Sequence, residues 1–108
     1  MATNTGRLGV ALVPATTLTT VYTVPSNIYS VVNVSITNRN ATAISVRLAM
    51  ASNATPNIQE YIEYNTTIVA NGVFERTGLV LNAGLNIVVY SDTANVNCTV
   101  YGIETSTS

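Results

Sequence analysis

Two segments of this chain alternate between apolar and polar residues, with the period of a β-strand that has one buried face. In residues 28–37 the even-numbered positions are mostly isoleucine and valine, whereas Asn33, Ser35 and Thr37 occupy the other face. Residues 44–50 repeat the pattern, with an apolar side chain at every even-numbered position. No window has the spacing of three and four residues that marks an amphipathic helix, so the sequence predicts an all-β fold.

Turn-forming residues interrupt the chain at intervals of about ten residues, which predicts about seven to nine short strands. The expected strands are residues 8–13, 18–24, 28–37, 44–50, 58–64, 68–69 with 73–77, 79–81 with 85–91, and 96–103. Such a series is typical of an antiparallel β-sandwich or jelly roll. We expect a single domain over residues 1–108, with polar arms at about residues 1–7 and about residues 104–108.

The turn sequences also predict which strands pair. Asn71-Gly72 is the strongest short hairpin signal, because a type I′ turn needs a positive φ at both central residues. The run 82–84 predicts a second tight turn. Residues 28–37 and 44–50 are expected to pair as a hairpin through a loop of about five residues.

The alternation further predicts which side chains form the core. Cys98 is the sole cysteine and lies in an alternating run, so we expect a buried structural thiol and no disulfide within the chain. The predicted core is Ile28, Val32, Val34, Ile36, Ile44, Val46, Leu48, Met50, Val88, Tyr90, Val96, Cys98 and Val100.

The composition lacks most of the side chains on which catalysis usually depends. The chain has no histidine, its only basic residues are four dispersed arginines, and it has only five carboxylate side chains. General acid/base catalysis then lacks its usual groups, and Glu60 and Glu63 are expected on opposite faces of a strand. We expect no enzyme, no metal site, no cofactor, no nucleic-acid binding and no membrane segment or secretory signal.

Several segments place apolar residues on both faces of an expected strand. These are Val31-Val32 and the runs 79–81 and 87–89. A strand that is buried on both faces has apolar residues at successive positions. Either another chain or a loop of this chain is therefore expected to cover part of the outer surface. The candidate interface residues are Arg7, Tyr29, Val31, Tyr61, Arg76, Leu79 and Leu81. Arg76 is expected to pair with Glu60 or Glu63, or with a neighbouring subunit, and not with its neighbour Glu75.

The order of segments within residues 18–104 resembles small virion structural proteins of tailed bacteriophages, especially those of cyanobacterial and other marine phages. The resemblance is carried by LTTVYTVP, a valine-rich strand ending in TNRN, then VRLAMA, YIEY, GVFERTGLVLNAG, VVYS and VYGIE. It implies a β-sandwich made in the host cytoplasm that decorates or cements the capsid surface. The implied partners are the major capsid protein and copies of the chain itself, as a homo-oligomer such as a trimer.

Two other functions remain open from the sequence. The first is a tail, baseplate or fibre component, which the same resemblance allows. The second is a carbohydrate-binding β-sandwich, in which Tyr61, Tyr64 and Tyr90 would be the stacking platforms, although the chain has no tryptophan.

Overall fold

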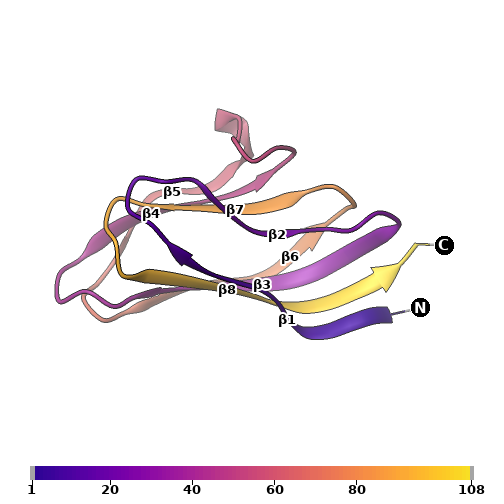
Figure 1. Cartoon of the computed structure of the whole chain (residues 1–108), viewed down its shortest axis with the longest axis horizontal. Helices are drawn as coiled ribbons and strands as arrows, with labels where there is room; N and C mark the ends of the chain where they lie inside the picture. Colours follow the sequence, from indigo (N-terminus) through magenta and orange to yellow (C-terminus); the bar gives the residue numbers. More distant parts are fainter. Residues whose placement is uncertain (1, 108) are drawn as a thin grey trace.

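The computed structural model describes residues 2–107 and contains eight β-strands and one short 3₁₀ helix in that range (Figure 1). The elements are β1 (Ala2–Val13), β2 (Thr19–Thr23), β3 (Ile28–Asn38), β4 (Ile44–Ala51), η1 (Ile58–Glu60), β5 (Tyr61–Ile68), β6 (Val73–Leu81), β7 (Asn86–Ser91) and β8 (Val96–Ser106). The predicted all-β class and strand number are confirmed.

The strands form two antiparallel sheets that pack as two layers (Figure 1). The first sheet has the order β1-β8-β3-β6, and the second has the order β2-β7-β4-β5. β1 pairs with β8, β2 with β7, β3 with β6 and β4 with β5, so the pairs are nested around the β4–β5 connection. This nested order is that of an eight-stranded jelly roll, one of the two architectures that the sequence predicts.

Two of the expected hairpins are wrong. β3 and β4 lie in different sheets, so residues 28–37 and 44–50 do not pair. Asn71 has φ 54° but Gly72 is not in the positive-φ region, so the turn is not type I′, and it joins β5 to β6 across the two layers. The run 82–84 also crosses between layers. Turn rules describe strands adjacent in one sheet, whereas these connections span the roughly 10 Å between packed sheets.

The expected loose arms are also wrong for the residues that the structure describes. β1 starts at Ala2, and its residues from Thr5 to Arg7 pair with residues 101–103 of β8. β8 continues to Ser106, beyond the expected end of the last strand. Polar side chains are compatible with strand structure here because the backbone bonds to the neighbouring strand while one face is open to water. Residues 1 and 108 lie outside the described range.

The core between the sheets contains most of the predicted side chains. Eleven of the thirteen predicted core residues are buried, while Met50 and Tyr90 are partly buried. Cys98 is fully buried, and this burial raises the pKa of its thiol to about 12, as expected for a structural cysteine.

β7 is the strand where the predicted facing was wrong. Ile87 and Val89 point into the main core, whereas Val88 packs with Ala49 and Ala51 in a separate small cluster. Valine or isoleucine occupies three successive positions of this strand, so alternation could not define its register.

The two open sides of the sandwich are closed in different ways. Near β1 and β2, a Cβ at Gly9 would lie 2.3 Å from the Val21 carbonyl oxygen, so glycine allows the two backbones to approach. On the other side, Arg76 of β6 forms an ion pair with Glu63 of β5, which links the two sheets. The predicted pairing of Arg76 with a carboxylate other than Glu75 is therefore confirmed.

Replacing Leu48 by alanine is expected to lower the free energy of unfolding by about 2–5 kcal/mol, because the substitution leaves a cavity between the sheets. Ile58→Ala removes the same number of carbon atoms from a side chain that is 72% exposed. That control should change the free energy by less than about 0.5 kcal/mol. Urea unfolding followed by circular dichroism measures both, and equal losses at the two positions would contradict the assigned core.

Candidate functional site

The described part of the chain offers no enclosed site. Residues 2–107 contain no pocket and no group of three or more acidic, histidine or cysteine side chains able to hold a metal ion. No helix in this range is long and apolar enough to cross a membrane.

The outer face of the first sheet carries most of the exposed apolar side chains. Seven of the eleven large hydrophobic residues that are exposed lie there. We call this surface the exposed apolar face, and its apolar members are Val10, Leu12, Tyr29, Val31, Val73, Val80 and Ile103. Exposed apolar residues scattered singly are ordinary, but a concentration on one flat face is typical of an interaction surface.

Strand register arranges five of these seven side chains in two rows across the sheet. In one row, Val31 pairs with Val80 of β6 and with Ile103 of β8. The other row begins with Val73 on β6 and ends with Leu12 on β1, with Thr37 and Asn97 between them.

The positions between the two apolar rows are mostly polar. One row contains Asn33 and Tyr101, and the next contains Ser35 and Thr99. The exposed apolar face thus has apolar ends and a mostly polar centre along the strand direction, in which Val10 of β1, beside Thr99, is the apolar exception.

Few charges lie on this face. Arg7 is exposed on the edge strand β1, and Glu75 is exposed on the opposite edge strand β6. Glu75 accepts a hydrogen bond of 3.2 Å from the Tyr101 hydroxyl, whose pKa is raised by partial desolvation and by the Glu75 charge. At the rim, Arg39 donates from Nε to Asn97 Oδ1 at 2.6 Å.

The structure separates the residues expected at the interface. Arg7, Tyr29 and Val31 lie on the exposed apolar face. Tyr61 is on the second sheet, and Arg76 forms the ion pair at the sandwich edge.

The expectation for Leu79 and Leu81 is wrong. These side chains are 8% and 0% exposed and point between the sheets, so neither presents a contact surface. Alternation along β6 places Val80 outward instead.

Sequence reasoning missed five members of this face: Val10, Leu12, Val73, Val80 and Ile103. The signal for Val80 was present, since it lies between two core leucines in one strand. The others become neighbours only through the pairing of strands distant in sequence.

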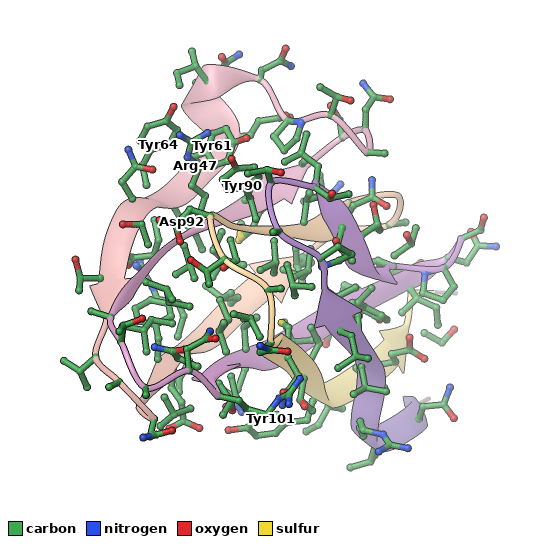
Figure 2. The ribbon with its side chains drawn as sticks, turned by 60° about the vertical axis from the view of Figure 1, so that its left-hand side comes forward. Arg47, Tyr61, Tyr64, Tyr90, Asp92 and Tyr101 are labelled. Carbon is green, nitrogen blue, oxygen red and sulfur yellow. The ribbon has the colours of Figure 1, made fainter. Side chains whose placement is uncertain are left out.

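The outer face of the second sheet carries an aromatic cluster around Arg47 (Figure 2). The Arg47 guanidinium carbon lies 4.2 Å from the Tyr64 ring centroid and 4.7 Å from the Tyr90 ring centroid. Tyr61 packs edge-on against Tyr64 with centroids 5.1 Å apart, and Arg47 Nε donates to Asn65 Oδ1 at 2.8 Å. We call these side chains the tyrosine cluster, and Figure 2 shows Tyr101 on the opposite side of the sandwich from them.

The tyrosine cluster brings together the three residues that a carbohydrate-binding function would use. However, Arg47 occupies faces of both Tyr64 and Tyr90, which are the surfaces that a sugar ring would stack on. Only Tyr64, at 49% exposure, is markedly open to solvent. The cluster is therefore packed mainly against itself.

The chain covers part of the second sheet with its own residues. Val88, Ala49 and Ala51 face outward yet are buried, and Tyr61 packs against them. The apolar run 87–89 is thus explained by cover from this chain, one of the two alternatives that the sequence left open.

The loop between β4 and β5, which leads into Tyr61, is held by Glu60. Its carboxylate accepts hydrogen bonds from the backbone nitrogens of Asn57 at 2.8 Å and Ser52 at 3.1 Å. These backbone bonds, the one from Asn57 first, lower the pKa of Glu60. The Glu60 carboxylate therefore has a structural role, because it holds the loop between β4 and β5 in place.

A buried polar network joins both ends of the chain to the core. The Tyr22 hydroxyl donates to Glu104 Oε2 at 2.5 Å and lies 2.6 Å from Ser30 Oγ, while Asn4 Nδ2 donates to Glu104 Oε1 at 2.9 Å. Burial, followed by the hydrogen bond to Glu104, raises the pKa of Tyr22 to about 12. The network satisfies a carboxylate inside a β-sandwich, which is a structural requirement.

Tyr22 is expected to make stability depend on pH above its unfolded-state pKa of 10.0, because its folded-state pKa is about 12. The contribution is fully present below pH 10.0 and is lost as the pH rises through about 12. The difference in unfolding free energy between the wild type and Tyr22→Phe should therefore shrink over this range. Tyr29→Phe, at an exposed position, is the control, and a constant difference for Tyr22→Phe would contradict the network.

The chain matches no family model, no curated protein and no solved structure. The fold and the two outer faces are therefore the features that bear on its function.

Proposed function

We propose that this protein is a non-enzymatic structural component of a phage virion that decorates or cements the capsid. In this role it bridges neighbouring major capsid subunits and associates with copies of itself. The observation that carries the proposal is the exposed apolar face, the outer face of a four-stranded sheet on a chain whose described part has no pocket. Such a surface suits contact with another protein more than the binding of a small molecule.

The topology and the surface chemistry support the same role. Jelly rolls are common among viral capsid and lectin domains, so the fold raises both possibilities and decides neither. The exposed apolar face has few charges, and its hydroxyl and amide side chains need no ion pairing when water is excluded. A protein that binds only the assembled shell stabilises that shell by mass action, by about 2.7 kcal/mol per site at a free concentration of 100 Kd.

Tail attachment is the second candidate, because it needs the same kind of surface. A lectin-like function is the third, and the gathering of Tyr61, Tyr64 and Tyr90 favours it. The position of Arg47 against two of these rings argues against it. If the chain does bind a glycan through this cluster, Tyr64→Ala should abolish that binding on a glycan array.

The direct test is to locate the chain in purified phage particles by density mapping. We expect copies on the capsid surface over contacts between major capsid subunits. Particles made without the chain should release their DNA at a lower temperature, and added purified chain should restore the difference. Density confined to the tail, or particles that lack the chain altogether, would contradict the capsid proposal.

A further inference from the structure

We propose that the exposed apolar face binds the same face of a second copy, around a two-fold axis that runs close to the strand direction. The inference deepens the self-association part of the proposed function by naming its surface and symmetry. The area of the face, its charges and the order of its apolar rows indicate that its occupant is a second copy of this chain.

The area of the face matches that of a stable interface. Besides the four rows already described, Tyr29 pairs with Thr105 in a fifth. Four strands about 4.8 Å apart and five outward rows about 6.8 Å apart cover roughly 19 by 30 Å, or roughly 600 Å² per copy. Two such faces together bury roughly 1,200 Å², at the lower end of the range for specific protein interfaces.

The charges are complementary under this symmetry. A two-fold axis along the strands places β6 of one copy over β1 of the other, so Glu75 meets the strand that carries Arg7. Glu75 pairs with Ser35, and Arg7 pairs with Tyr101, which lies one outward row away on β8. The offset of about 7 Å along the strands is within the reach of an arginine side chain. The symmetry makes this contact twice.

The apolar rows also match, because an axis along the strands superimposes each row on its own copy. β3 then lies over β8 of the partner, so Val31 meets the partner's Ile103. In the other row, Val73 of β6 meets the partner's Leu12 on β1. Between these rows, Asn33 meets the partner's Tyr101 and Ser35 meets the partner's Thr99, so hydroxyl and amide groups face hydrogen-bond partners. At the edges of the Ser35 row, Glu75 lies opposite the partner's Val10.

The alternative axis, perpendicular to the strands, is disfavoured by the same residues. It places β1 on β1 and β6 on β6, so the Arg7 side chains approach each other and so do the Glu75 side chains. Like charges in these positions oppose association. The arrangement along the strands therefore accounts for both the charges and the apolar rows.

The face-to-face arrangement determines which surfaces remain to bridge neighbouring shell subunits. The resemblance implies a homo-oligomer such as a trimer, whereas the face-to-face contact closes as a dimer. In that dimer the two second sheets, each with its tyrosine cluster, point away from each other. The exposed apolar face then supplies the contact between copies, and contact with the shell subunits falls to the two outward second sheets, which suits a clamp between neighbouring subunits.

A charge exchange in the purified full-length chain tests the predicted contact. Sedimentation velocity over a range of concentrations should show a dimer for the wild type. Arg7→Glu alone and Glu75→Arg alone should each raise the dissociation constant by at least about tenfold, because each creates two like-charge contacts. The double variant Arg7→Glu/Glu75→Arg should restore association. Arg7 and Glu75 lie on opposite edges of one sheet, so rescue would report a contact between copies.

A matched pair of substitutions tests the apolar row. Ile103→Asp should abolish the dimer, whereas Ile58→Asp, on the short helix η1 away from this face, should leave it intact. Circular dichroism checks that both variants are folded. A wild type that stays monomeric at high concentration, a dimer insensitive to Ile103→Asp, or a double charge variant without rescue would overturn the proposal. None of these measurements involves phage particles, so this inference and the capsid proposal can fail separately.

Discussion

The pairing of β1 with β8 is the contact on which the rest of the structure depends. Its register runs from Ala2 opposite Thr105 to Val13 opposite Val96. All other elements of the fold therefore lie between these two strands in the sequence. Once the ends are joined, the other pairs are nested inside, and every connection except that between β4 and β5 crosses from one sheet to the other. One neutral amide, that of Asn38, links two of these crossings. Asn38 is fully buried and its amide donates to carbonyl oxygens of both the β3–β4 and β5–β6 connections, including that of Val69 at 3.0 Å.

The alternation of apolar and polar residues predicted which face of a single strand is buried, but not which strands pair with one another. Alternation placed Val34 and Cys98 correctly in the core because each strand has one clearly apolar face. It failed in β7, where apolar residues occupy both faces and Tyr61 covers the outward one. The turn at Asn71 was recognised as a turn, yet turn sequence does not say whether the chain returns to the same sheet or crosses to the other. That choice is made by pairing between strands distant in sequence, which a local pattern does not contain.

The candidate surface was predictable to the same limited extent. Val31 was identified because apolar residues occupy both faces of one strand, and Tyr29 because tyrosine side chains suit interfaces. Leu12 and Val73 join them only when β1 and β6 become the two edges of the first sheet. The two outer faces differ in whether their apolar side chains are covered. The second sheet buries Val88 under its own chain, and Arg47 packs between two tyrosine rings. The first sheet leaves its apolar rows open, which is why we assign the contact between copies to it.

An isotope-filtered NOE experiment tests this assignment most directly. A mixture of ¹³C-labelled and unlabelled chains would be examined for contacts between the methyl groups of Leu12 and Val73. Within one chain these residues lie on opposite edge strands, three strand spacings or roughly 14 Å apart, too far for such a contact. We expect intermolecular NOEs between the two side chains. Intermolecular NOEs confined to other surfaces, or none at concentrations where the chain is associated, would contradict it.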